Sequence, residues 1–200
     1  MATKFSSEEE YLISLKLPIS KLIQQNGPID FSTKKKDPFN ELVNIVISQF
    51  ISTKAAAGIK KKMLISLNEK KFSTRSFQKL SIQEIKDLGL STNKAKSIKE
   101  LEKYFSSQST KNSIFKLSKT DREKELLNIF GIGPWSVEMF EMFCARDLNI
   151  FSPGDAALRE AMKTLNMVDS KDFQEYTQYA EKWNPYKTIA CLHLWYFIEN

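Results

Sequence analysis

The chain has 200 residues, of which 42% are hydrophobic, and this is enough for one compact globule or two small lobes that share a cleft. The same apolar content excludes wholesale disorder. The 30 lysine and arginine residues against 24 acidic ones give a net charge of +6 and an isoelectric point near 9.1. That charge suits a polyanionic partner, and it equally suits a soluble protein that is merely basic.

Neither the N-terminus nor the cysteines indicate secretion. Residues 1–10 are polar and acidic and contain no signal-peptide core, and no apolar run reaches the length of a membrane span. Cys144 and Cys191 lack C-x-x-C spacing, which excludes a thiolate zinc site and a four-cysteine iron–sulfur cluster. The pair also provides no disulfide framework, so we expect a reducing cytoplasm. Because no apolar run is long enough to span a membrane, we expect no membrane partner.

Helical signals follow one another along the chain. Capping residues precede apolar residues at helical spacing, as at Ser6, at Asp37 before Pro38, and at Ser81 three residues before Glu84. Alternating runs long enough for strands are absent, so the sequence predicts an all-α fold of about ten helices. After two short N-terminal helices, we expect helices at residues 39–49, 53–67, 82–87, 92–105, 121–130, 134–145, 156–165, 173–183 and 186–198, with a loop at residues 72–78.

Two glycine turns join predicted helices. The first, at residues 88–91, precedes lysines at positions 94, 96 and 99, and another lysine run occupies positions 60–62. These lysines could line a phosphate track, although a charge run is usually a solvated face. The second turn is Gly131-Ile132-Gly133, followed by a helix that begins at Pro134.

The Gly131–Gly133 turn is suited to binding a phosphate. Glycines permit positive φ and leave backbone N–H groups uncovered, and the next helix N-terminus adds to them. Proline fits position 134 because the first helical turn needs no N–H donor there, and Ile132 can tuck between the two helices. A Gly-x-Gly turn between core helices is also common, so the triplet alone leaves both interpretations open.

The longer string around this turn resembles the helix-hairpin-helix (HhH-GPD) DNA glycosylases, most closely the DNA-3-methyladenine glycosylase II branch. The segments that carry the resemblance extend in order from about Leu17 to Tyr196: Asp37-Pro38-Phe39, Ile47-Ser48-Gln49, Gly89-Leu90-Ser91, Lys94-Ala95, Gly131-Ile132-Gly133-Pro134-Trp135-Ser136, Phe151-Ser152-Pro153-Gly154-Asp155, Trp183-Asn184-Pro185 and Leu192-His193-Leu194-Trp195-Tyr196. It implies two helical lobes. Residues 37–147 form one, with the hairpin at about residues 121–145, and residues 1–36 with 148–200 form the other.

The resemblance also implies an activity. We expect a monomeric base-excision enzyme that removes alkylated purines, 3-methyladenine first and 7-methylguanine next, from double-stranded DNA and leaves an abasic site. Such an enzyme would associate with the nucleoid in a bacterium or lie in the nucleus of a eukaryote. Two alternatives stay open: a non-catalytic DNA-damage-binding protein that keeps the hairpin, and a glycosylase of the same fold for deaminated or oxidised bases.

Asp155 occupies the place of the family's catalytic aspartate. A carboxylate beside C1′ stabilises the oxocarbenium-like sugar and can orient or deprotonate the attacking water. The alternative is a plain N-cap for the helix at residues 156–165, and both roles can hold together. Trp135 stands where bifunctional relatives carry a lysine nucleophile, and because an indole cannot form a Schiff base we expect hydrolysis without strand cleavage.

Aromatic faces would receive a flipped, cationic base. Trp135 and Trp195 match family pocket tryptophans, Tyr196 is adjacent, and Met139 lies one helical turn beyond Trp135, where a relative has tyrosine. The resemblance places an intercalating wedge at Phe50, for which a buried core role is the alternative.

The remaining expectations concern ions and core residues. The resemblance implies that the backbone carbonyls of Leu127, Ile129 and Ile132 hold Na⁺ or K⁺ at the hairpin, with no other cofactor required. Trp183 and the single histidine, His193, lie in apolar surroundings, so we expect both in the core. One histidine cannot build a multi-histidine metal site.

Overall fold

The computed structural model describes residues 4–32, 34–106 and 113–200, and every regular element within these ranges is helical. The all-α prediction is confirmed. The chain divides into a terminal unit, formed by Met1–Lys34 with Arg146–Asn200, and a central unit, formed by Lys35–Ala145. The sequence predicts lobe boundaries at residues 37 and 148, whereas the structure divides at residues 35 and 146.

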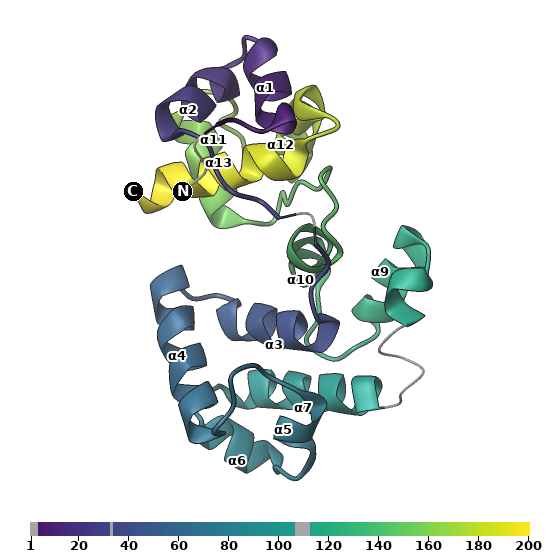
Figure 1. The fold of residues 1–200 in the computed structure, drawn as a ribbon. Coiled ribbons are helices and arrows are strands. Elements are labelled where there is room, and N and C mark those ends of the chain that lie inside the picture. Colours follow the sequence, from purple (N-terminus) through teal and green to yellow (C-terminus); the bar gives the residue numbers. More distant parts are fainter. Residues whose placement is uncertain (1–3, 33, 107–112) are drawn as a thin grey trace. The chain divides into compact units, whose positions relative to one another are not determined.

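Helix α13 is the centre of the terminal unit. It packs against α11 and α2, which lie beside it in Figure 1. Its buried residues occur all around the helix, which explains why its sequence is apolar rather than amphipathic. The elements of this unit are α1 (Ser7–Ser14), α2 (Pro18–Asn26), α11 (Ala156–Thr164), α12 (Phe173–Ala180), the 3₁₀ turn η3 (Glu181–Trp183) and α13 (Lys187–Glu199).

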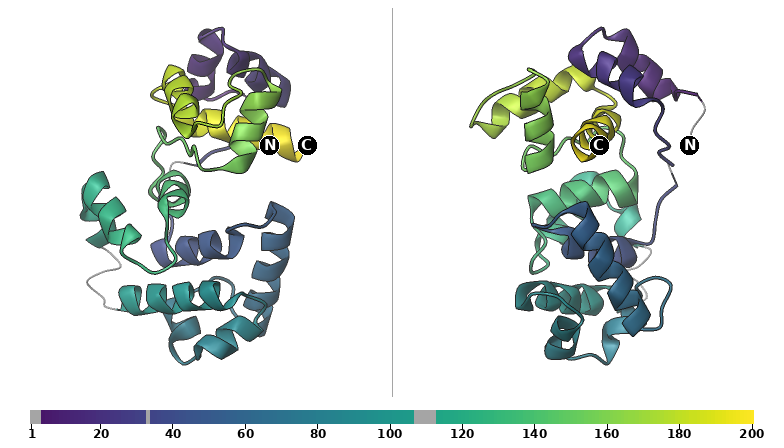
Figure 2. Two further views of the ribbon diagram at one scale, coloured as in Figure 1. Left: turned by 180° about the vertical axis from the view of Figure 1, so that it is seen from behind. Right: turned by 90° about the vertical axis from the view of Figure 1, so that its left-hand side faces the viewer.

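Helix α3 has the corresponding position in the central unit. It packs against α7, α10 and α4, and Figure 2 shows α3 in blue beside α7 in teal from two further directions. The elements of this unit are α3 (Pro38–Ser48), α4 (Thr53–Ser66), α5 (Thr74–Gln78), α6 (Ile82–Asp87), α7 (Thr92–Ser106), the 3₁₀ turn η1 (Ile114–Lys116), α9 (Lys119–Leu127), α10 (Pro134–Phe140) and the π-helical turn η2 (Glu141–Ala145).

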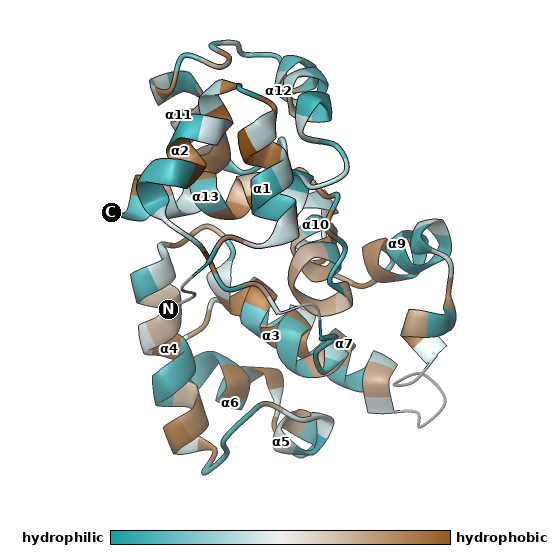
Figure 3. Ribbon diagram, turned by 45° about the horizontal axis from the view of Figure 1, so that its top comes forward, coloured by the Kyte–Doolittle hydropathy of each residue, from teal (hydrophilic) through white to brown (hydrophobic). Residues whose placement is uncertain are grey.

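The core of the central unit is aromatic where α3 meets α5 and α7. The Phe39 ring lies 6.0 Å from that of Phe77 and 6.1 Å from that of Phe105, centroid to centroid. Such tilted and edge-to-face pairs stabilise the core beyond the burial of their area. Helix α9, which begins the hairpin, is mainly hydrophilic, as the teal colour of much of its ribbon in Figure 3 shows.

The predicted elements were wrong at two places and differ in helix type at two more. Residues 72–78 contain a helix, α5, because Ser73 and Ser76 form a reciprocal cap and Phe77 is fully buried. The helix expected to reach residue 130 ends at Leu127, where the chain begins a tight turn. The segments 134–145 and 173–183 are helical over the predicted bounds, but the first ends in a π-helical turn after Phe140 and the second in a 3₁₀ turn.

Among the residues that the structure describes, none of the helices has both the length and the apolar character needed to cross a membrane. In the same ranges, no group of three or more His, Cys, Asp or Glu side chains is gathered as ligands for a metal ion.

Candidate functional site

The turn between α9 and α10 is closed by short-range backbone hydrogen bonds. Ile129 N–H donates to Leu126 O at 3.1 Å, and Ile132 N–H donates to Ile129 O at 3.0 Å. Gly131 adopts a left-handed backbone with φ +81°, and Gly133 is the extended N-cap of α10 with φ −104°. Ile132 is buried beneath the turn, as its sequence position predicted.

Glycine is found at positions 131 and 133 for different physical reasons. A Cβ on Gly131 would lie 1.8 Å from Ser97 Oγ of α7, and φ +81° is unfavourable for any other residue, so glycine is required twice over. Gly133 has an ordinary φ, and a Cβ there would meet nothing within 4 Å. Of the two properties expected of these glycines, Gly131 uses the positive φ, whereas Gly133 leaves the backbone uncovered.

The side chain of Gln49 links the end of α3 to the hairpin. Its Nε2 donates to Gly131 O at 2.9 Å and to Ser136 Oγ at 2.9 Å. The sequence marked Gln49 as part of a motif without giving it a role. These bonds fix the residue before Phe50 to the turn and to the first part of α10.

A buried ion pair braces the two arms of the hairpin. The guanidinium of Arg122 on α9 donates to both carboxylate oxygens of Glu141 in η2, each at 2.6 Å, and its Nη1 donates to Leu117 O at 3.2 Å. The Glu141 side chain is 1% exposed and that of Arg122 is 11% exposed. Bidentate geometry of this kind is strong and directional. Sequence reasoning missed it, because no local pattern relates these two positions.

Phe50 is a fully exposed aromatic residue with φ +58°. A β-turn-like contact, from Ile51 N–H to Ser48 O at 3.4 Å, closes the chain around it. The alternative that Phe50 belongs to the core is wrong. Exposure and a left-handed backbone at a large residue are both costly, which is typical of a functional position.

Asp155 is the N-cap of α11. Its Oδ1 accepts a hydrogen bond from Leu158 N–H at 3.0 Å and another from Trp195 Nε1–H at 3.1 Å. The cap keeps the carboxylate at the positive end of the helix, and the indole of α13 fixes its direction. Arg159 Nη1 donates to Pro153 O at 2.6 Å, which stabilises the turn that precedes Asp155.

The four residues expected to line the base pocket fall into two groups. Trp195 and Tyr196 lie on α13 of the terminal unit, where Trp195 is bonded to Asp155 and Tyr196 is 45% exposed. Trp135 and Met139 lie on α10 of the central unit, one helical turn apart; Met139 is buried and Trp135 is partly exposed. Each unit therefore carries part of the predicted set.

Two lysines of the expected phosphate track bind carbonyls of the protein itself. Lys94 Nζ donates to Ile47 O and to Gln49 O, each at 2.8 Å. Lys99 Nζ donates to Phe77 O at 3.0 Å and to Gln78 O at 3.1 Å. These ammonium groups cap the C-termini of α3 and α5, where orphan carbonyls and the helix dipole favour a cation.

Trp183 and His193 are fully buried, which confirms the core role expected for both. His193 Nε2 lies 3.0 Å from Glu9 Oε1, and its Nδ1 lies 3.3 Å from Asn26 Nδ2. Burial lowers the pKa of His193, against the hydrogen bond and the charge of Glu9, which act to raise it. The network joins α1, α2 and α13.

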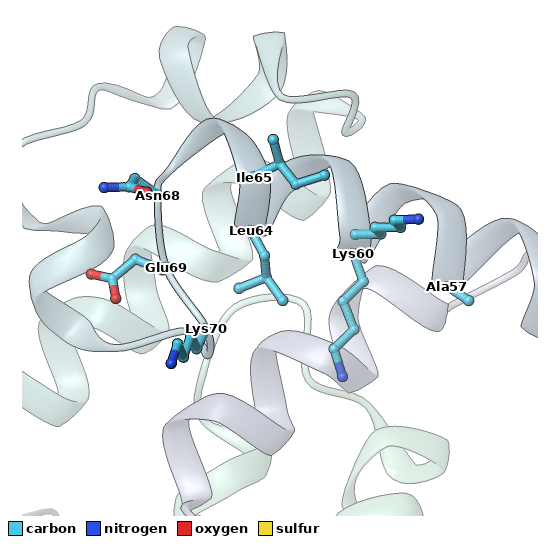
Figure 4. A pocket seen from close by; sticks show the side chains of 8 residues that line it. Ala57, Lys60, Leu64, Ile65, Asn68, Glu69 and Lys70 are labelled. Carbon is cyan, nitrogen blue, oxygen red and sulfur yellow. The ribbon is translucent and has the colours of Figure 1, made fainter.

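A pocket of about 620 Å³ lies along one face of α4 and the residues after it. Figure 4 shows its lining side chains, which are Ala57, Lys60, Lys61, Leu64, Ile65, Asn68, Glu69 and Lys70. It contains no aromatic side chain and none of the predicted catalytic residues. This pocket therefore lacks the groups needed to hold and cleave a nucleotide.

Residues 43–185 match the HhH-GPD superfamily of base excision DNA repair proteins, and this range includes the hairpin, Phe50 and Asp155. The chain belongs to the HhH-GPD superfamily. It is a base excision repair glycosylase, and the recognition made from the sequence is confirmed. The family match ends before α13, so it does not include Trp195. The evidence that Trp195 belongs to the site is its hydrogen bond to Asp155.

Three comparisons show how similar this HhH-GPD chain is to known proteins. DNA-3-methyladenine glycosylase 1 of Schizosaccharomyces pombe is 27% identical over 168 residues, covering 82% of this chain and 74% of the relative. The structure of S. pombe Mag1 in complex with abasic DNA has a TM-score of 0.84 at 24% identity, covering 95% of both chains. DNA-3-methyladenine glycosidase of Bacillus halodurans has a TM-score of 0.76 at 26% identity, covering 96% of this chain and 89% of that chain.

Proposed function

We propose that this protein is a monofunctional glycosylase that hydrolyses the N-glycosidic bond of alkylated purines, 3-methyladenine and 7-methylguanine, in double-stranded DNA. The observation that carries the proposal is the carboxylate of Asp155, whose Oδ1 is fixed by Leu158 N–H and Trp195 Nε1–H. The relatives named for 3-methyladenine in S. pombe and B. halodurans support the substrate class.

The chemistry asks little of the protein beyond one carboxylate. As the bond to the base breaks, positive charge develops at C1′, and a carboxylate fixed beside it stabilises that charge. Water adds to C1′ and gives up a proton, for which Asp155 is the proposed acceptor. Alkylation at N3 or N7 makes the base cationic, so it departs as a neutral molecule with the electrons of the broken bond and needs no general acid.

The proposal of hydrolysis alone rests on Trp135. Strand cleavage by this fold requires an amine that attacks C1′ and forms a Schiff base, and Trp135 stands at the position where bifunctional relatives carry lysine. An indole nitrogen has no lone pair available for that step. We therefore propose that the product is an abasic site in an intact strand, and that Trp135 offers an aromatic face to the cationic base.

DNA binding is proposed at the hairpin. The uncovered backbone at Gly133 allows a phosphate to approach the N–H groups of the turn, because no Cβ stands in the way. The carbonyls of Leu127, Ile129 and Ile132 are neutral oxygen donors, which suits Na⁺ or K⁺. The Ile129 carbonyl also accepts from Ile132 N–H, and its second lone pair can still bind an ion. A bound cation would supply positive charge for the phosphate.

Phe50 is the proposed wedge. A base can be reached only after it leaves the stack, and an apolar side chain that enters the duplex fills the gap. Phe50 is fully exposed, and it directly follows Gln49, whose Nε2 donates a hydrogen bond to Gly131 O in the hairpin. An aromatic ring in water at a left-handed position has no structural benefit, so contact with DNA accounts for it best.

The test is base release from matched duplexes that differ in one lesion. Duplexes with 3-methyladenine, 7-methylguanine, a deaminated base or an oxidised base are incubated with excess protein, and free base is measured by chromatography. We expect release from the two alkylated duplexes and none from the others. Release only from a deaminated or oxidised base would replace the substrate class, and binding without release from any duplex would establish the non-catalytic alternative.

A further inference from the structure

The ammonium of Lys94 lies at the C-terminal end of α3, just before the exposed Phe50. Its two hydrogen bonds, each 2.8 Å long, go to the carbonyls of Ile47 and Gln49. The side chain is half-buried, and this burial lowers the pKa of Lys94. Two of its three N–H donors are therefore directed into the protein, which leaves it poorly suited to serve as a surface phosphate ligand.

These two carbonyls control the backbone on the N-terminal side of Phe50. Gln49 is the C-cap of α3, and its carbonyl belongs to the peptide that joins it to Phe50. A bond to that oxygen fixes the plane of the peptide, and the next φ is the left-handed +58° of Phe50. A phenylalanine does not stay in this region without support from its surroundings.

The same helix also contacts the hairpin. Ser97 lies one turn beyond Lys94 on α7, and its Oγ occupies the space that a Cβ on Gly131 would need. Gln49 Nε2 donates a hydrogen bond to Gly131 O at 2.9 Å. The first turns of α7 therefore hold both the residues before Phe50 and the apex of the hairpin, all within the central unit.

We propose that Lys94 is a positioning residue, which holds Phe50 in its wedge conformation at a fixed spacing from the Gly131–Gly133 turn, and does not act by binding a DNA phosphate. The inference rests on the proposed function, because it assigns Lys94 to the wedge step of base excision. It replaces the phosphate-track interpretation of this lysine.

The first test reads the conformation of Phe50 without DNA. Chymotrypsin cleaves after exposed aromatic residues, and cleavage after Phe50 requires the chain around it to open. We expect Lys94→Met to speed cleavage at this bond by about tenfold or more, while Lys103→Met, which removes an exposed lysine from the same helix, leaves the rate unchanged. Equal rates in Lys94→Met and wild type would overturn the proposal whether or not the protein excises bases.

The second test separates positioning from phosphate binding. In single-turnover excision we expect Lys94→Met and Phe50→Ala each to lose activity, by up to about 100-fold, and the double variant to be no worse than the poorer single variant. The salt dependence of binding to undamaged duplex should stay as in wild type. Additive losses, or a salt slope lower by about one, would show a direct phosphate contact instead.

A third variant keeps the proposal testable if Lys94→Met does not fold. Lys94→Gln has an amide that can donate to one of the two carbonyls, so it should fall between wild type and Lys94→Met in both the cleavage and excision measurements. If wild type releases no base from any duplex, the proposed function fails, and the proteolysis result alone decides whether Lys94 holds Phe50.

Discussion

The hairpin turn at Gly131–Gly133 and the turn that ends in Asp155 are stabilised in opposite ways. At the turn, side chains fix the backbone: Gln49 binds Gly131 O, and the Arg122–Glu141 pair braces the two arms. At Asp155, the backbone N–H of Leu158 and the indole of Trp195 fix one carboxylate. The proposed DNA binding therefore depends on backbone shape, which many residues maintain, whereas the proposed chemistry depends on one side chain.

The largest expected effect is the loss of catalysis in Asp155→Asn. Asparagine is as good an N-cap as aspartate, and its Oδ1 can still accept from Leu158 and Trp195. The fold should therefore persist, while the loss of the negative charge lowers single-turnover base release by roughly 10²–10⁴-fold. Thermal unfolding checks that the fold persists, and the excision assay measures the loss of base release. A wild-type rate would remove Asp155 from the reaction.

The next effect concerns the brace of the hairpin. Glu141→Gln leaves the Arg122 guanidinium buried without its carboxylate, and breaking such a pair costs about 3–5 kcal/mol of folding free energy. Denaturant unfolding of this variant should show a clear loss of stability. Glu100→Gln, an exposed position on α7, is the matched control and should unfold as wild type does. Equal stability of both variants would mean that the pair does not brace the hairpin.

The two glycines of the turn should separate stability from binding. Gly131→Ala forces a left-handed alanine against Ser97, so the backbone alone costs about 1–2 kcal/mol and the melting temperature falls. Gly133→Ala has room for its methyl group and should melt as wild type does, yet bind duplex DNA about tenfold more weakly. Calorimetry and a fluorescence binding titration measure the two effects. Unchanged binding by Gly133→Ala would place the DNA elsewhere.

The smallest expected effect is a pH dependence from His193. Burial lowers its pKa in the folded protein from the ordinary value of 6.5, so the unfolded chain binds the proton more readily. Folding stability is therefore expected to fall as the pH drops below about 6.5. Melting temperatures at about pH 7.5 and pH 5.5 should differ more for wild type than for His193→Gln, which cannot take up this proton. An identical difference in both proteins would assign the effect to other groups.

Local patterns were sufficient for most of the helices, because caps and apolar spacing lie within a few residues of each other, but the short helix α5 was missed. The resemblance located the hairpin and Asp155, since both are short continuous motifs. Gly133 shows the limit of this reasoning: the sequence offered positive φ and an uncovered backbone as reasons for both glycines, and only the structure shows that Gly133 needs just the second.

The interactions that hold the site could not be predicted in this way. Arg122 meets Glu141, and Lys94 meets the end of α3, only after the chain has folded. Charge runs in the sequence suggest contact with solvent or phosphate, and nothing local distinguishes a lysine that caps a helix. Phe50 posed the same problem, because an exposed and a buried phenylalanine have the same neighbours in the sequence.

The most direct measurement follows one duplex through a single turnover. DNA labelled on the lesion strand and carrying 3-methyladenine is incubated with excess protein, and free base and strand breaks are quantified before and after alkali. We expect wild type to release free base and to leave an intact strand that breaks only after alkali, and we expect Asp155→Asn to do neither. Strand breaks before alkali, or no free base, would contradict it.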